Sequence, residues 1–186
     1  MIIVISGPSA VGKGTIIRKL LQMDNKLELG ITCTTREKRC NEIEGNEYYF
    51  LTKEGFQKKI DKGELVEYSI VHGNFYGVPQ ETILKGLQGE KDIILQIDVQ
   101  GAKKIKNKFD EAILIFIMPP DINTLLKRIK TRATESPEEV EKRLKRAIKE
   151  IEERFFYDYI ILNEDLDKAT LEILHIIESE REKKLR

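Results

Sequence analysis

The sequence has few of the residues that stabilise small secreted domains, and no segment that could cross a membrane. Its 186 residues include two cysteines and no tryptophan, too few cysteines for a disulfide framework. No apolar run approaches the length of a bilayer span. The apolar start, Met1 to Ile5, is short and has no basic flank, so it does not predict a signal peptide. We therefore expect a cytoplasmic protein with reduced thiols.

An excess of charge of one sign is also missing. Lysine plus arginine and aspartate plus glutamate number 32 each, so the formal net charge is zero. Because no global positive field exists, we expect neither nucleic acid nor a membrane as a partner, and any anion site must be local. The content of 40% hydrophobic and 34% charged residues predicts a folded domain rather than a disordered chain. The length fits a single domain, residues 1–186.

Short apolar runs alternate with amphipathic segments along the chain. Two runs are continuously apolar, as central parallel strands are, and residues 27–33 alternate in the way of a strand with one buried face. The alternation of strands with helices predicts an α/β fold, with an open, mostly parallel sheet whose ligands lie at the carboxyl ends of its strands. The predicted strands are Ile2 to Ile5, Leu27 to Cys33, Leu65 to Val71, Ile93 to Ile97, Ile113 to Met118 and Tyr159 to Leu162.

Two helices are predicted between Met118 and Tyr159, and the apolar positions Ala169, Ile173, Leu174 and Ile177 predict a last amphipathic helix. Asp121 is positioned to cap the first, which continues to about Lys130. The second begins at Ser136-Pro137-Glu138-Glu139, which has the spacing of a capping box and a proline at the first helical position.

A glycine-rich loop joins the first predicted strand to the first predicted helix. In this context backbone N–H groups and a helix N-terminus can bind phosphate oxygens, and Lys13 adds a positive charge. The alternative is an ordinary turn, but both glycines, the lysine and the context favour nucleotide binding. We expect the nucleotide-binding residues Gly7, Pro8, Ser9, Ala10, Val11, Gly12, Lys13, Gly14 and Thr15.

One position departs from the strict phosphate-loop pattern. The pattern requires Ser or Thr after the lysine as a magnesium ligand, but Gly14 follows Lys13 and Thr15 comes only afterwards. We therefore expect the cofactor Mg²⁺ to be held mainly by nucleotide oxygens and waters, which this ion often retains, and assign no protein side chain to it.

A second group of anion-binding side chains follows residue 33. Arg36 and Arg39 are three residues apart, and Tyr48 and Tyr76 could add hydroxyl donors. The two arginines alone are equally typical of a solvated charged loop. The motifs around them decide the interpretation.

Over essentially the whole chain the sequence resembles the guanylate kinase family. The phosphate loop is one motif of this resemblance, and the others follow in the family's order. They are Thr32-Cys33-Thr34-Thr35-Arg36 with Arg39, Glu42, Gly45 and Tyr48; Glu67 with Gly73-Asn74-Phe75-Tyr76-Gly77; Ile94 to Gly101; Pro119-Pro120; residues 128–135 with Arg143; and Asn163 to Ala169.

The resemblance implies a P-loop fold with an inserted GMP-binding lobe, residues 32–81, and a helical lid, about residues 121–155. It implies ATP-dependent phosphorylation of GMP, with ATP and GMP as small-molecule partners. Arg36, Arg39, Tyr48 and Tyr76 would hold the GMP phosphate, Glu67 and Thr32 would recognise guanine, Gly77 would belong to the same site, and Asp98 would lie near the acceptor or the metal. Lys13 and the lid residues Arg128, Arg132 and Arg143 would be catalytic, and Asn163 would lie near the adenine of ATP.

Two positions differ from the commonest residues of the family. Thr32 stands where serine is usual and keeps the hydroxyl group. Val78 stands where a hydroxyl residue is common, so no side-chain contact is expected from it.

Glu67 has two interpretations. Guanine presents N1–H and the 2-amino group side by side, so a carboxylate can accept from both, whereas the N1 of adenine is an acceptor and would leave the carboxylate unpaired. From the strand pattern alone, however, alternation places Glu67 on the solvent face. The other function classes are a nucleoside monophosphate kinase for another base and a non-catalytic interaction module, and the phosphate loop with its lysine argues against the module.

Overall fold

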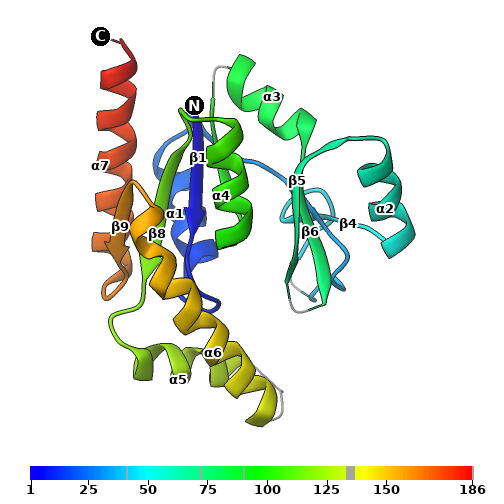
Figure 1. Ribbon diagram of the computed structural model, residues 1–186. Coiled ribbons are helices and arrows are strands. Elements are labelled where there is room, and N and C mark those ends of the chain that lie inside the picture. The colour runs from blue at the N-terminus through cyan, green and yellow to red at the C-terminus, as the bar shows by residue number, and fades with distance from the viewer. Residues whose placement is uncertain (41, 72, 90, 133–136, 186) are drawn as a thin grey trace. The chain divides into compact units, whose positions relative to one another are not determined.

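The protein is described by a computed structural model that covers residues 1–40, 42–71, 73–89, 91–132 and 137–185, without the side chain of Arg132 (Figure 1). The contacts divide it into two compact units. One comprises Met1–Val4 and Lys26–Ile113, and the other comprises Ile5–Asn25 and Leu114–Arg186.

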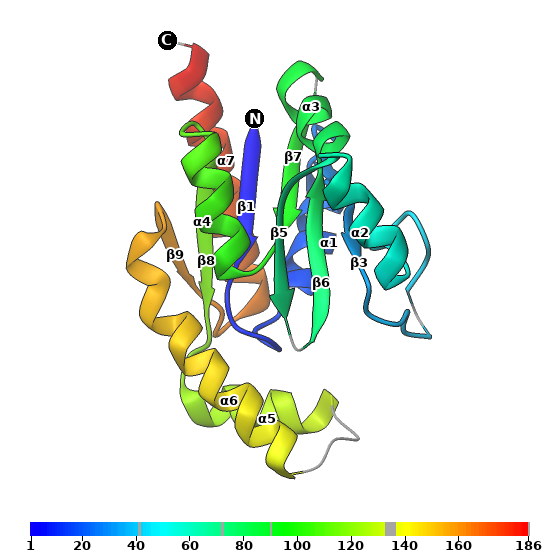
Figure 2. The same cartoon turned by 45° about the vertical axis from the view of Figure 1, so that its right-hand side comes forward.

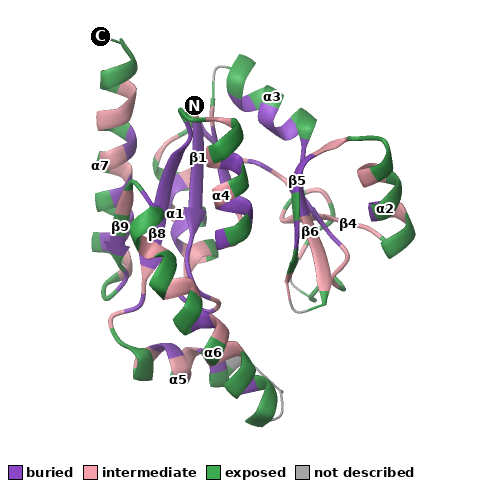
Figure 3. Ribbon diagram, viewed as in Figure 1, coloured by how far each residue is buried: buried purple, intermediate pink, exposed green. Residues whose placement is uncertain are grey.

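A five-stranded sheet has the order β2-β7-β1-β8-β9. The pairs β2–β7 and β8–β9 are parallel. All five residues of β1 are buried (Figure 3). Its neighbours β7 and β8 correspond to the continuously apolar runs Ile93 to Ile97 and Ile113 to Met118, which are predicted as central strands. The predicted α/β class is therefore confirmed. The strands are β1 (Ile2–Ser6), β2 (Leu27–Leu29), β7 (Asp92–Gln96), β8 (Ile113–Met118) and β9 (Tyr159–Leu162).

The first unit also contains a separate, mixed four-stranded sheet of order β4-β3-β6-β5 (Figures 1 and 2). The pair β3–β4 is parallel, while β6 is antiparallel to both β3 and β5. The strands are β3 (Thr32–Thr34), β4 (Tyr48–Phe50), β5 (Leu65–Val71) and β6 (Asn74–Pro79). The helices of this unit are α2 (Lys53–Asp61), α3 (Gln80–Gln88) and α4 (Val99–Lys108).

The prediction of one strand over residues 27–33 is wrong. The segment divides at Gly30 into β2 and β3, which belong to different sheets. The Gly30 N–H donates to the Ile94 carbonyl at 2.8 Å, and a Cβ on Gly30 would lie 2.6 Å from Leu95 Cδ2. Alternation of apolar residues identifies extended backbone but not the partner strand, so the change of sheet left no signal in the pattern.

The second unit contains the other four helices of the described residues: α1 (Lys13–Met23), α5 (Ile122–Arg132), α6 (Pro137–Glu152) and α7 (Leu166–Leu185), with a 3₁₀ turn at Glu153–Phe156. The predicted cap is present, since Asp121 Oδ1 accepts from the Thr124 N–H at 2.8 Å. Ser136, the cap predicted for α6, lies outside the described residues. In the described parts of the chain, no helix is long and apolar enough to span a membrane.

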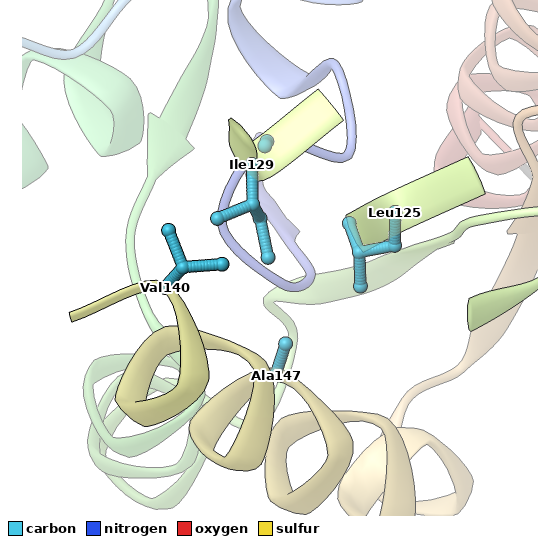
Figure 4. Close-up of a cluster of buried hydrophobic side chains, with 5 residues drawn as sticks. Leu125, Ile129, Val140 and Ala147 are labelled. Atoms are coloured by element: carbon cyan, nitrogen blue, oxygen red, sulfur yellow. The ribbon is translucent and has the colours of Figure 1, made fainter. Parts of the chain in front are cut away.

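Helices α5 and α6 share a small apolar core (Figure 4). Leu125 and Ile129 of α5 pack with Val140 and Ala147 of α6, and Ala10 of the glycine-rich loop belongs to the same cluster. The two helices are therefore attached to the loop by buried apolar contacts rather than by charges alone.

Candidate active site

The glycine-rich loop between β1 and α1 is tightly wound. Gly7 and Gly12 have φ values of 139° and 108°, and Ala10 has φ 65°. A Cβ on Gly7 would lie 2.4 Å from the Ile117 carbonyl oxygen of β8. Only glycine allows the backbone to approach β8 this closely, and the loop leads directly into the N-terminus of α1, where backbone N–H groups can bind an anion.

The Lys13 side chain turns back over this loop. Its Nζ donates to the carbonyl oxygens of Gly7 at 2.6 Å and Pro8 at 3.0 Å. The ammonium group is therefore held beside the N-terminal turn of α1, where both charges attract phosphate.

Two residues from distant parts of the second unit support the loop at Val11. The Val11 carbonyl accepts from Asn163 Nδ2 at 2.7 Å and from Arg128 Nη1 at 3.2 Å. Asn163 is 4% exposed, and its amide donates a hydrogen bond to the loop rather than to solvent. Its implied contact with adenine stays a prediction. Arg143 lies half-buried on α6, while the side chain of Arg132 is outside the described part.

We expect Gly12→Ala to lower the free energy of unfolding by about 2 kcal/mol or more, because a strained φ costs about 1–3 kcal/mol. In addition, the new Cβ would lie 2.6 Å from Asn163 Nδ2. Urea unfolding measures the loss. The matched control is Gly63→Ala, where φ is 65° and, apart from the two chain neighbours, no atom of the described residues lies within 4 Å of the Cβ, so a loss of about 1 kcal/mol is expected. Equal losses in the two variants would contradict the importance of the Asn163 contact.

In the first unit, Arg36 and Arg39 share one carboxylate. Arg36 Nη2 lies 2.7 Å and Arg39 Nη1 3.8 Å from Glu42 Oε1, and the Arg39 backbone N–H donates to Glu42 Oε2 at 2.9 Å. Burial acts to raise the pKa of Glu42, but the hydrogen bonds from Arg36 and from the Arg39 backbone hold this pKa below its usual value. Glu42 thus stays ionised and keeps the two guanidinium groups on one side of the loop.

This role of Glu42 was missed by the sequence reasoning, which named the residue only as part of a motif. A signal was present, since an acid three residues after one arginine and six after another can pair with both in a tight turn.

Tyr48 and Tyr76 stand beside Arg36. Their rings meet edge to face with centroids 6.0 Å apart, and the Arg36 Cζ lies 5.6 Å from the centre of the Tyr48 ring. Burial, with a smaller contribution from Tyr76, raises the pKa of Tyr48 to about 12. Its hydroxyl therefore remains a hydrogen-bond donor at neutral pH. The structure thus brings together the two cations and two tyrosines that the sequence analysis assigns to the GMP phosphate, and their binding of an anion stays a prediction.

Glu67 is buried, with 5% of its surface exposed, so the solvent-facing interpretation is wrong. The reason is a register shift in the β5–β6 pairing between Leu65 and Glu67. Val66 and Glu67 are consequently both buried, and alternation then continues with Tyr68 outside and Ser69 inside. A bulge of this kind redirects a side chain, and bulges are frequent beside active sites.

The carboxylate of Glu67 is incompletely paired. Its Oε2 makes no hydrogen bond to any residue that the structure describes. Burial raises the pKa of Glu67 to about 7; Lys104 and Lys108 oppose this rise and Asp98 adds to it. A buried acceptor without a partner is costly, and such groups mark functional sites.

Asp98 lies at the start of α4, close to this carboxylate. It caps the helix, because its Oδ1 accepts from the Gly101 N–H at 2.9 Å, and Ser69 Oγ donates to the same oxygen at 3.3 Å. A Cβ on Gly101 would lie 3.0 Å from Glu67 Oε1. The structure thus brings Glu67, Ser69 and Asp98 together, and neither Ser69 nor Gly101 was predicted as part of a site.

Thr32 and Gly77 lie in the same four-stranded sheet. Thr32 is buried in β3. Gly77 lies in β6, and a Cβ there would stand 2.9 Å from Phe56 Cζ and 3.1 Å from the Glu67 carbonyl oxygen. The glycine allows β6 to pack against α2 and β5. The predicted contacts of Thr32 and Gly77 with GMP stay predictions.

A glycine loop with a lysine, placed between a buried strand and a helix of an α/β sheet, defines the class as a P-loop nucleotide-binding protein. The model of the family described as "Guanylate kinase" matches residues 1–180. The guanylate kinase of Caldanaerobacter subterraneus subsp. tengcongensis is 43% identical over 181 residues, which cover 97% of this chain and 88% of the relative.

The guanylate kinase of Clostridioides difficile is also 43% identical, over 98% of this chain and 89% of the relative. The crystal structure of guanylate kinase from Anaplasma phagocytophilum has 35% sequence identity and a TM-score of 0.80, covering 97% of this chain and 85% of that one. The chain belongs to the guanylate kinase family, whose reaction is the ATP-dependent phosphorylation of GMP to GDP.

Proposed function

We propose that this chain phosphorylates GMP by binding guanine at Glu67, the GMP phosphate at Arg36 and Arg39, and ATP at the loop of Lys13. In this proposal residues 1–186 form one catalytic domain, with residues 32–81 as the GMP lobe and about 121–155 as the lid. The observation that carries the proposal is the buried Oε2 of Glu67, which lacks a partner among the described residues.

Recognition of the base follows from this oxygen. The N1–H and 2-amino groups of guanine are adjacent donors, and the two oxygens of one carboxylate can accept from both. Adenine would place its N1 acceptor against the carboxylate and leave a buried charge unpaired, which can discriminate by about 10⁴-fold. Thr32 and Asp98 add polar groups from β3 and the start of α4.

Recognition of the GMP phosphate follows from the arginines. Glu42 already holds Arg36 and Arg39 on one side of their loop, so little side-chain order is lost when the phosphate binds. One carboxylate does not neutralise two guanidinium groups, so a positive charge remains for the phosphate. The hydroxyls of Tyr48 and Tyr76 are available as further donors.

The transfer itself needs no dedicated general base, because an oxygen of the GMP phosphate is already ionised. Positioning and neutralisation of charge carry the catalysis. Lys13 stabilises the charge on the transferring phosphoryl group and on the β-phosphate of the departing ADP. In this proposal Arg128, Arg132 and Arg143 contribute to the same stabilisation, and α5 and α6 exclude water from the phosphates.

Magnesium accompanies ATP in this proposal. Within the described part of the chain no group of three His, Cys, Asp or Glu could hold a metal ion, and Gly14 offers no side chain at the usual ligand position. Phosphate oxygens and waters suit Mg²⁺, which usually keeps several waters when it binds. When bound, the ion supplies charge neutralisation. The cytoplasmic location inferred from composition stays a prediction.

The purified protein should be assayed with ATP and each of GMP, AMP, CMP and UMP, by coupling ADP release to a spectroscopic signal. We expect turnover with GMP and much weaker turnover with the other three. Preferred turnover of AMP would indicate a kinase for another base, and absence of turnover with every acceptor would indicate an interaction module. Either result would overturn the proposal.

A further inference from the structure

Strand β5, which carries Glu67, is an edge strand, because it ends the order β4-β3-β6-β5. The carbonyl oxygens on either side of Glu67 nevertheless have partners. The Tyr68 carbonyl accepts from Lys104 Nζ, and the Val66 carbonyl accepts from Lys108 Nζ. Both lysines lie on α4, so one helix holds the backbone on both sides of the base-recognising residue.

The spacing along α4 places these contacts on one helical face. Gly101, Lys104 and Lys108 are separated by three and then four residues, the separations at which side chains share a face. At Gly101 this face approaches the Glu67 carboxylate itself, with 3.0 Å from an added Cβ to Oε1. Lys104 Nζ also lies 5.3 Å from the centre of the Tyr68 ring.

Protection of a sheet edge by lysines is a common device, and it would account for either lysine alone. Edge protection alone does not explain why the two lysines bind the carbonyls of Val66 and Tyr68, which flank the buried Glu67. The register shift leaves Val66, the residue before Glu67, without a partner position on β6, so contacts from outside the sheet can help to fix the backbone beside Glu67. Helix α4 supplies that restraint from the open edge.

We propose that Lys104 and Lys108 are positioning residues that fix the Glu67 carboxylate against the first turn of α4 and so determine the discrimination of guanine from bases without a 2-amino group. This inference rests on the proposed role of Glu67 in binding guanine. The charges of the two lysines also favour the ionised form of Glu67, which is the form that accepts hydrogen bonds from guanine. Lys104 and Lys108 favour the ionised carboxylate, whereas burial and Asp98 oppose it.

The test is the ratio of kcat/KM for GMP to that for inosine monophosphate, which keeps N1–H but lacks the 2-amino group. In Lys104→Met/Lys108→Met this ratio should fall about tenfold or more, because a displacement of about 1 Å is already worth on the order of 10²-fold. The loss should lie mainly in KM for GMP, and kcat should change less. Lys104→Arg/Lys108→Arg, which keeps donors and charge, should restore most of the ratio.

The matched control is Lys106→Met. It removes a lysine of the same helix that also donates to a carbonyl, that of Ala112 at 2.8 Å, but that lies two residues from Lys104 and so off the helical face shared by Gly101, Lys104 and Lys108. The ratio should remain unchanged in this variant. If it falls as far as in the double variant, the effect comes from the stability or charge of the helix and the inference is wrong.

A cycle with Glu67→Gln separates the two proposals. If Glu67→Gln removes the preference for GMP over inosine monophosphate and the lysine substitutions then cause no further change, the role of Glu67 and the positioning role of the lysines are both supported. If Glu67→Gln abolishes the ratio but Lys104→Met/Lys108→Met keeps it, the positioning inference alone fails. If Glu67→Gln keeps the ratio, the proposed role of Glu67 fails and this inference fails with it. Thermal unfolding of each variant identifies any that do not fold, and the single substitutions then replace the double one.

Discussion

Lys13→Ala is expected to lower kcat for GMP phosphorylation by about 10²- to 10³-fold, the usual effect of removing one group that stabilises transition-state charge. Lys13 Nζ lies 2.6 Å and 3.0 Å from the two carbonyl oxygens at the start of the phosphate loop. In the proposed mechanism, the negative charge of the donor phosphates is neutralised at this position beside the N-terminus of α1. Initial rates with saturating ATP and GMP measure the loss.

Lys19→Ala is the matched control for this prediction. Lys19 belongs to the same helix and pairs with Asp167 at the surface, and exposed pairs contribute at most about 1 kcal/mol to stability. Turnover by Lys19→Ala should therefore be nearly normal. A folded Lys13→Ala protein with turnover close to that of the unmodified enzyme would exclude the assignment of the loop to the donor phosphates.

Glu67→Gln is expected to weaken GMP use and at the same time to stabilise the free protein at alkaline pH. The amide places a donor opposite the donors of guanine and removes the charge. The fall in kcat/KM for GMP should therefore correspond to about 2 kcal/mol or more of lost transition-state stabilisation. The two effects have one cause, since a buried carboxylate held ready for a ligand is unfavourable before the ligand binds.

The pKa shift of Glu67 determines whether Glu67→Gln raises or lowers the free energy of unfolding at each pH. Burial raises the pKa of Glu67 from 4.5 to about 7 in the folded protein, so between these values the native state holds the proton that the unfolded state has lost. The stability of the unmodified protein therefore falls as pH rises from 4.5 to 7. Above pH 7 the gain in Glu67→Gln reaches up to about 3 kcal/mol, and below pH 4.5 it vanishes.

Urea unfolding at pH 4.5 and pH 8 measures this gain. Glu64→Gln is the opposite control, because the hydrogen bond from Lys59 lowers the pKa of Glu64 and its substitution should not stabilise. In the kinetic arm, kcat/KM for GMP relative to Glu67→Gln should fall as pH decreases through about 7. The titration of the GMP phosphate is common to both proteins and cancels. Full kcat/KM for GMP in Glu67→Gln, or equal use of inosine monophosphate and GMP by the unmodified enzyme, would disprove the role of Glu67.

The phosphate loop and several strands of the five-stranded sheet could be predicted because their signals are local. Gly7, Gly12 and Lys13 have a fixed spacing, and β8 and β9 begin and end at the residues that the apolar pattern indicates. Both depend only on neighbours in the chain.

The burial of Glu67 could not be predicted from the strand pattern, because it depends on a bulge in the pairing with β6. The division of residues 27–33 between two sheets likewise depends on partners that are distant in sequence. Periodicity describes one strand at a time, whereas a bulge and a change of sheet are properties of two strands.

The apolar cluster shared by Ala10, α5 and α6 makes the phosphate loop and the two helices one cooperative unit in local unfolding. Opening the helices removes the contacts that bury Ala10, and disordering the loop exposes Ile129 and its neighbours. Any ligand that binds only the ordered loop therefore adds its binding free energy to the stability of α5 and α6. We therefore expect binding of the phosphoryl donor at the loop to stabilise this pair of helices through the methyl group of Ala10 and the uncharged side chains that pack against it.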